Sequence, residues 1–275
     1  MTDMPQPIRR VACTVWRGEA PSMGERAIPE ETAIAFSYNR LTHAVMMATP
    51  ADLEDFAVGF SLAEGVIASA KDIQELDVVP GEQGVELRMW IADSRNTAFE
   101  DRRRKMAGPT GCGLCGMESL AEAIRTPPRV TADLHVSATT IMAALASMPP
   151  AQALNQQTRA VHAAAYWEPG RGLVALREDV GRHNALDKLA GAVARSGASA
   201  ARGIVLITSR VSVEMVQKVA IMGAPILVAV SAPTALALRM AEAAGITLAA
   251  IARDDGFEIF THDRRIELNG AEHVA

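Results

Sequence analysis

The sequence predicts an α/β protein in which a smaller α+β unit, residues 1–108, precedes a larger α/β unit, residues 109–275. Three short, continuously apolar runs alternate with helical patterns in the second unit, at residues 204–207, 226–230 and 246–252. Such runs are typical of a sheet that has parallel pairs and is covered by helices. With 275 residues, 49% of them hydrophobic, the chain is long enough to bury a substantial core.

The first unit reads as several strands and one helix. Strand patterns cover residues 11–17, 31–38, 42–48, 78–80 and 84–92. The helix is predicted to begin with Thr49 as its N-cap, with Pro50 in its first turn, and to end at Gly65. We expect Cys13 to be a small buried hydrophobic residue.

The second unit is predicted to begin with a helix that Thr139 or Thr140 caps and that continues to residue 148. Residues 161–167 and 172–178 are expected to form paired strands. Helices are predicted at residues 184–195 and 212–222, and a third is started by residues 231–234 and runs to residue 244. Gly197 and Gly245 follow the first and the last of them.

Composition excludes several classes of protein. A formal net charge of −5 argues against nucleic-acid binding driven by phosphate neutralisation. Residues 1–10 lack the pattern of a signal peptide, and Arg239 and Glu242 interrupt the longest apolar run, so we expect no membrane span. Three cysteines are too few for a disulfide framework, and the sequence therefore predicts a protein of the reducing cytoplasm.

Two of the cysteines, Cys112 and Cys115, lie in the glycine-rich loop formed by residues 109–116, directly before a helical pattern. The positive end of a helix dipole favours a thiolate and lowers the pKa of a thiol below about 8.5. Arg102 to Lys105, just upstream, add positive charge. The loop has the features expected of a nucleophilic sulfur site. A structural zinc half-site and an ordinary surface loop remain alternatives.

Polar loops follow three of the predicted strands. In a sheet with parallel pairs, ligands bind at the carboxyl ends of the strands and the amino ends of the following helices. The loops at residues 178–184, 208–210 and 253–256 are therefore expected on one rim, as a cradle for a phosphorylated ligand. For each loop alone, helix capping and solvated charge are the plainer explanation. The cations that we expect at this rim are Arg182, His183, Lys188, Arg210 and Arg253.

The chain resembles the formate dehydrogenase accessory sulfurtransferase family (FdhD) nearly from end to end. The most specific motifs are the loop Thr110-Gly111-Cys112-Gly113-Leu114-Cys115-Gly116 and the stretch Glu178-Asp179-Val180-Gly181-Arg182-His183-Asn184-Ala185, followed by Asp187-Lys188. Residues 49–60, 231–234 and 260–266 also match. The chain departs from the family before His162, where it has Thr158-Arg159-Ala160, and at Thr208-Ser209-Arg210.

The resemblance implies a sulfur carrier that accepts a persulfide from a cysteine desulfurase. The sulfur would pass to the molybdenum (or tungsten) bis(molybdopterin guanine dinucleotide) cofactor that formate dehydrogenase needs. On this reading Cys112 carries the persulfide and Cys115 assists. The resemblance also implies a cytidine-deaminase-like fold for residues 109–275 and a homodimer.

GDP-like nucleotides are expected to bind as mimics of the guanosine end of the cofactor. An aspartate can accept paired hydrogen bonds from guanine, while an arginine can bind phosphate. The expected pocket, shared with the 178–188 stretch, is formed by Ile251, Ala252, Arg253, Asp254, Asp255 and Gly256.

Three other functions are alternatives to sulfur transfer. A zinc-dependent deaminase pairs its C-x-x-C with an upstream His-x-Glu, whereas His43-Ala44-Val45 lacks the glutamate, so no metal site is expected. A thioredoxin-type oxidoreductase expects the motif soon after a strand, but here a charged helical pattern precedes it. A chaperone that binds the cofactor without transferring sulfur is the third alternative.

Overall fold

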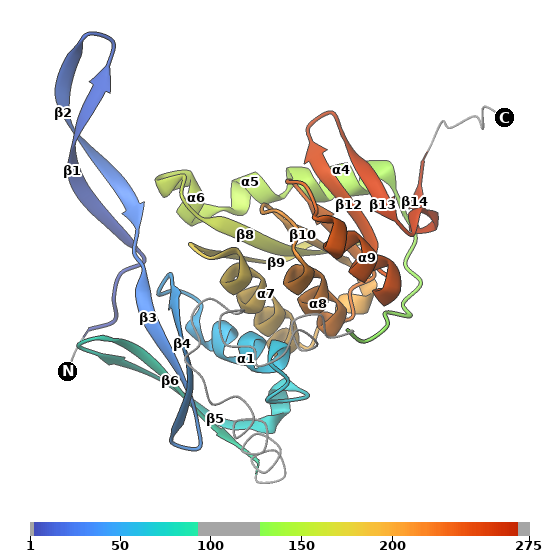
Figure 1. Cartoon of the computed structure of the whole chain (residues 1–275), viewed down its shortest axis with the longest axis horizontal. Coiled ribbons are helices and arrows are strands. Elements are labelled where there is room, and N and C mark those ends of the chain that lie inside the picture. The colour runs from blue at the N-terminus through green and yellow to red at the C-terminus, as the bar shows by residue number, and fades with distance from the viewer. Residues whose placement is uncertain (1–2, 93–126, 269–275) are drawn as a thin grey trace.

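The computed structural model describes residues 3–92 and 127–268 and shows a mixed α/β protein (Figure 1). The strands are β1 (Ile8–Arg17), β2 (Ala20–Pro29), β3 (Thr32–Tyr38), β4 (Leu41–Ala48), β5 (Ile73–Gly81), β6 (Gly84–Ile91), β7 (Val136–Ser137), β8 (His162–Glu168), β9 (Gly172–Asp179), β10 (Ile204–Ile207), β11 (Ile226–Ala229), β12 (Thr247–Arg253), β13 (Gly256–Thr261) and β14 (Ile266–Glu267). The helices are α1 (Leu53–Ala63), α4 (Ala138–Ala146), α5 (Met148–Ala151), α6 (Ala153–Thr158), α7 (Arg182–Ser196), α8 (Val213–Met222) and α9 (Ala235–Ala244).

The first sheet has four strands in the order β4-β3-β6-β5. Strand β3 pairs antiparallel with β4 and parallel with β6. Helix α1 covers one face of this sheet, where the ring of Phe60 stacks on that of Phe36 with centroids 4.1 Å apart. The phenol of Tyr38 reaches the hydroxyl of Ser61 at 2.7 Å, so its one buried polar group is satisfied.

The second sheet has six strands in the order β13-β12-β11-β10-β8-β9. Strands β10, β11 and β12 pair in parallel, and β8 pairs antiparallel with both β9 and β10. The predicted parallel strands and the predicted 161–167/172–178 pair are both confirmed.

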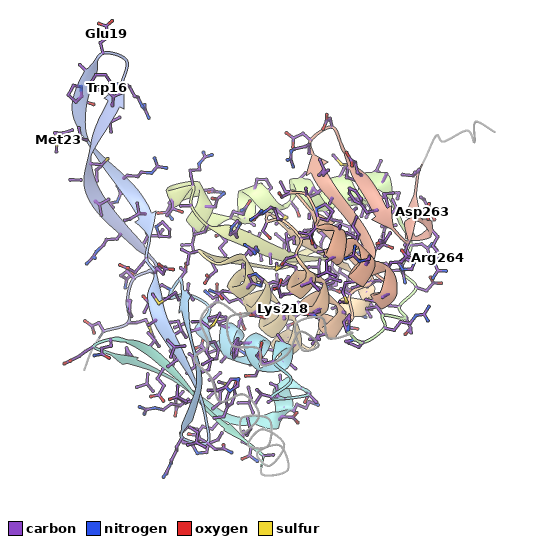
Figure 2. All side chains as sticks on the ribbon, in the orientation of Figure 1. Trp16, Glu19, Met23, Lys218, Asp263 and Arg264 are labelled. Carbon is purple, nitrogen blue, oxygen red and sulfur yellow. The ribbon has the colours of Figure 1, made fainter. Side chains whose placement is uncertain are left out.

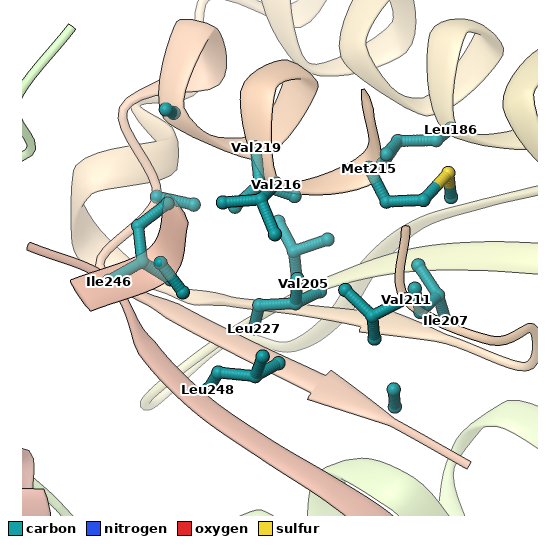
Figure 3. Packing of buried hydrophobic residues seen from close by; sticks show 14 of the residues in the cluster. Leu186, Val205, Ile207, Val211, Met215, Val216, Val219, Leu227, Ile246 and Leu248 are labelled. Carbon is teal, nitrogen blue, oxygen red and sulfur yellow. The ribbon is translucent and has the colours of Figure 1, made fainter. Parts of the chain in front are cut away.

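Buried residues on both faces make the second sheet the middle of three layers. Successive side chains of a strand point to opposite faces. In β10, Val205 and Ile207 face the cluster with α7, α8 and α9, whereas Ile204 and Leu206 face the cluster with α4. Figure 3 shows the first of these clusters, with side chains of α8 packed over those of the strands.

A two-stranded hairpin, β1–β2, projects away from both sheets (Figure 1). Trp16 and Met23 near its tip are 67% and 79% exposed (Figure 2). Cys13 lies in β1 as a half-buried free thiol, so the prediction of a buried residue was wrong. The ribbon is too thin to bury a side chain on either face.

The helix ends agree with the predictions in most places. Gly197 and Gly245 take positive φ at the ends of α7 and α9, and Thr234 caps α9 by accepting from the Ala237 N–H. Two caps were predicted wrongly: Ser137 caps α4 instead of a threonine, and α1 follows Asp52 instead of Thr49. Strands β2, β7, β13 and β14 and the short helices α5 and α6 were not predicted. Within the described part of the chain, no helix has both the length and the apolar character to cross a membrane.

Candidate functional site

The carboxyl ends of β9, β10, β11 and β12 meet at one edge of the second sheet, which we call the rim. Strand β9 runs in the same direction as β10 because β8 is antiparallel to both. The Thr208 hydroxyl accepts from the Ala163 N–H at 2.9 Å, and the Val211 N–H donates to the Ala232 carbonyl at 3.2 Å. The loop after β10 is thereby held against the start of β8 and against the loop after β11.

Helix α7 begins at the rim, and within residues 3–92 and 127–268 no side chain caps its N–H groups. Its N-cap is Gly181, and the first turn holds Arg182 and His183 and no acid. The buried Nε of Arg182 has no hydrogen-bond partner among the described residues. An uncapped helix N-terminus beside a cation favours an anionic ligand.

Two histidines near this helix end are held in the neutral form. Burial, with Lys218 and Arg182 nearby, lowers the pKa of His183 to about 4. Burial and Arg182 also lower the pKa of His162. At neutral pH both rings can therefore accept as well as donate a hydrogen bond.

Asp179 lies fully buried beneath the rim and links the part of the chain that forms the first sheet to the part that forms the second. We call Asp179 and its hydrogen-bond partners the Asp179 hub. The Asp179 carboxylate accepts from Lys188 Nζ at 2.6 Å, the Thr49 N–H at 3.0 Å and the Gly181 N–H at 2.7 Å. Asn184 Nδ2 donates to it at 3.0 Å. Lys188 also donates to the Thr49 carbonyl at 2.8 Å. The hub thus fixes the segment before α1 against the start of α7.

Lys188 consequently has a different place from the one that the sequence suggested. Its side chain has no exposed surface, and its charge is paired with Asp179. A buried, paired ammonium offers no free charge to a phosphate, so Lys188 shapes the rim from beneath instead of lining it.

A second buried pair links α7 to α8. Lys218 Nζ donates to Asp187 at 2.5 Å, and Asp187 is only 1% exposed. Burial raises the pKa of Asp187 to about 6 in spite of this cation. Lys218 lies beside His183, so the pair also sets the charge around the rim.

The two helices α1 and α7 approach each other through glycines. A Cβ on Gly59 would overlap the Asp187 carbonyl oxygen, and one on Gly191 would overlap the Asp55 carbonyl oxygen. Asp55, 5% exposed, accepts from Arg177 at 2.8 Å and from Arg195 at 2.5 Å. These contacts hold the first unit against the base of the rim.

The end of β12 carries the predicted guanine-binding loop. Ile251 has a positive φ of 53° within a register shift between Ala250 and Arg253. Arg253 is exposed, and its guanidinium donates to the Val230 and Ala252 carbonyls. Asp254 and Asp255 are exposed at the turn into β13. From β9 to β12 the rim spans four strand spacings of about 4.8 Å each, or about 19 Å.

The topology therefore brings most of the predicted cations to one edge: Arg182 and His183 on α7, exposed Arg210 before α8, and Arg253 at the end of β12. Cys112, Cys115 and the Arg102 to Lys105 run lie outside the described residues. The expectation of a ligand at this edge stays a prediction.

The residues that sequence reasoning missed are the buried polar ones. Asp55 and Lys218 were not singled out, and Thr49 was expected only as a helix cap, although each joins two elements. The spacing of Asn184 and Lys188 could have indicated a buried polar contact. They lie four residues apart on one face of the helix, and that face also carries Gly191. Among residues 3–92 and 127–268, no group of three His, Cys, Asp or Glu side chains could hold a metal ion.

Comparison with known proteins gives a consistent result. The FdhD/NarQ family model matches residues 29–267. A protein of Agrobacterium fabrum named sulfur carrier protein FdhD is 56% identical over 261 residues, 94% of this chain and 96% of the relative. A protein of the same name from Cupriavidus necator is 47% identical, over 93% of this chain and 89% of the relative.

A solved structure has the same fold. It is the crystal structure of a candidate formate dehydrogenase accessory protein from Desulfotalea psychrophila, with a TM-score of 0.73 and 26% sequence identity. The match covers 94% of this chain and 99% of that one. On the family model and on relatives that match along almost their whole length, the chain belongs to the FdhD/NarQ family.

Proposed function

We propose that this protein is a sulfur carrier that serves the maturation of formate dehydrogenase. One observation carries the proposal: a Cys-x-x-Cys loop, Cys112 to Cys115, in a chain that is 56% identical to a protein named sulfur carrier protein FdhD. The name of the Desulfotalea protein supports the link to formate dehydrogenase.

In the proposed reaction, the Cys112 thiolate attacks the outer sulfur of a cysteine desulfurase persulfide. An S–S bond forms on Cys112, and the desulfurase cysteine leaves as a thiolate. Attack by the Cys115 thiolate on the inner sulfur then makes a Cys112–Cys115 disulfide and releases hydrosulfide for the metal of the cofactor. Two cellular thiol groups reduce this disulfide by exchange, leave as a disulfide of their own, and restore both cysteines.

The acceptor that we propose is the molybdenum (or tungsten) bis(molybdopterin guanine dinucleotide) cofactor, bound at the rim as substrate. Its pyrophosphates suit the uncapped start of α7 with Arg182 and exposed Arg210. Its guanine suits Asp254 and Asp255, at the other end of a rim about 19 Å long. The protein would act in the cytoplasm as a homodimer.

Mass spectrometry tests the sulfur step. The purified protein is incubated with a desulfurase and cysteine, and the Cys112 and Cys115 peptides are searched for an added sulfur atom. Cys112→Ala should abolish loading and formate dehydrogenase maturation, whereas Cys13→Ala, on the projecting hairpin, is the matched control and should load normally. Full maturation with Cys112→Ala would show that the assignment is wrong.

Calorimetry tests the rim. GDP should bind more tightly than ADP, and Arg182→Gln should weaken both. Arg17→Gln, at the tip of the projecting β1–β2 hairpin, removes the same charge away from the rim and should change neither. Equal affinity for GDP and ADP would contradict the proposal that the rim recognises guanine. If Cys112→Ala blocks maturation but sulfur never appears on either cysteine, a chaperone that only binds the cofactor becomes the better explanation.

A further inference from the structure

A second cationic site lies at the opposite edge of the six-stranded sheet from the rim. It is a pocket of about 620 Å³ lined by Arg129, Asp133, His135, Arg264 and Arg265, among other residues. Arg265 contacts Thr247 at the first residue of β12, whereas the rim begins at the last residue, Arg253. Six residue steps of about 3.3 Å separate the two sites by about 20 Å.

Two fixed stretches of backbone form the walls of this pocket. The first runs from residue 129 to 135 and is held by the Val130 N–H, which donates to the Ala244 carbonyl at 2.8 Å. The second is the 3₁₀ turn Asp263–Arg265. Immediately beyond the pocket, β14 and β7 pair in parallel through Ile266 and Val136. The pocket is therefore part of the folded framework.

Arg265 carries the argument for a ligand. Only 2% of its surface is exposed, and it donates to the Ala132 carbonyl at 3.1 Å and to the Thr247 hydroxyl at 3.2 Å. Its Nε, also buried, has no hydrogen-bond partner among the described residues. A buried N–H of a charged group without an acceptor is costly, and an anion in the pocket would remove that cost.

The other charges of the pocket are also mostly positive. Arg129 and Arg264 are exposed, and Figure 2 shows Arg264 at the outer edge of the molecule, away from Lys218. The one acid of the lining, Asp133, is 3.2 Å from His135 and leaves a surplus of two positive charges when the histidine is neutral. A dianion matches this surplus, and the flat fork of a guanidinium matches phosphate oxygens.

We propose that this pocket, which we call the Arg264–Arg265 pocket, binds a small phosphate-bearing anion. It is separate from the cofactor rim of the proposed function and does not depend on it. No sulfur chemistry is assigned to it. The pocket is large enough for a phosphorylated metabolite and not only for a bare phosphate.

Calorimetry with pyrophosphate and the full chain tests the proposal. Arg264→Gln should weaken binding about tenfold, since a charge-assisted hydrogen bond is lost from an exposed side chain whose change should leave the fold intact. Asp133→Asn should tighten binding, and Arg26→Gln on β2 is the matched control. Malonate, a dicarboxylate, should bind more weakly than pyrophosphate.

Hydrogen exchange locates the bound anion. Pyrophosphate should slow amide exchange in residues 129–135 and 263–267 of the wild type, and less so in Arg264→Gln. The proposal is overturned if pyrophosphate does not bind at millimolar concentration, or if Arg264→Gln and Arg26→Gln bind it equally. Protection confined to residues 181–183 and 251–256 would place the anion at the rim and also overturn it. Malonate binding as tight as that of pyrophosphate would overturn the phosphate assignment.

Discussion

Replacing Lys188 by Met tests the Asp179 hub. The Met side chain fills much of the same volume but leaves the Asp179 carboxylate, which has no exposed surface, without its counter-charge. Three neutral donors remain to it: the Thr49 and Gly181 N–H groups and the Asn184 amide. None of them compensates the charge.

The expected loss in the free energy of unfolding is about 3 to 5 kcal/mol, the cost of breaking a buried ion pair by removing one partner. Removing the stranded charge as well should recover most of it, so Lys188→Met with Asp179→Asn should be more stable than Lys188→Met alone. As a control, Arg88→Met breaks the exposed Arg88–Glu86 pair and should cost about 0 to 1 kcal/mol.

Urea unfolding followed by tryptophan fluorescence measures these differences, because Trp90 lies in the first sheet and Trp167 in the second. A loss below about 1 kcal/mol for Lys188→Met, or a double variant no more stable than the single one, would refute the reasoning.

Two further predictions concern the helix contact and pH. Gly59→Ala should cost about 3 kcal/mol or more in unfolding free energy, because the new methyl group overlaps a carbonyl oxygen of α7. The control is Gly81→Ala, where the atom nearest to the new methyl group is 3.6 Å away. Equal costs for the two variants would contradict the argument. The folded-state pKa of His183, about 4, lies below its usual value of 6.5. Between these two pH values the unfolded chain therefore binds more protons than the folded one. The stability that the neutral ring contributes above pH 6.5 is lost as the pH falls towards 4. The loss is at most about 3 kcal/mol, and urea titrations at pH 7 and pH 5 should show a smaller drop for His183→Asn than for the wild type; equal drops would argue against the buried neutral ring.

The repetitive parts of the fold were predictable from local pattern. The apolar runs of β10, β11 and β12 and the glycines that end α7 and α9 depend on rules that act over a few residues. Strand β2 was missed because most of its residues are exposed and it has no alternating pattern. Strand β13 was missed because the turn before it, at Asp254 and Asp255, suggested the end of the sheet.

The polar framework of the candidate site was less predictable. Thr49 was expected to cap α1, yet its hydroxyl accepts from the Val180 N–H, 131 residues away. Lys188 was expected among the exposed cations, since lysine is rarely buried without a partner, and that partner was defined only by the three-dimensional fold. Sequence pattern places such residues on an element, but their partners come from tertiary contacts.

The contact between α1 and α7 has a consequence for biosynthesis. The Thr49 N–H meets the Asp179 carboxylate across 130 residues of chain. At ribosomal rates of about 5 to 20 residues per second, α1 emerges roughly 6 to 26 s before the helix that covers it. During that interval its glycine face and the Asp55 carboxylate lack their partners. The nascent first unit therefore exposes this surface until α7 has left the ribosome, and we expect chaperones to bind it during that time.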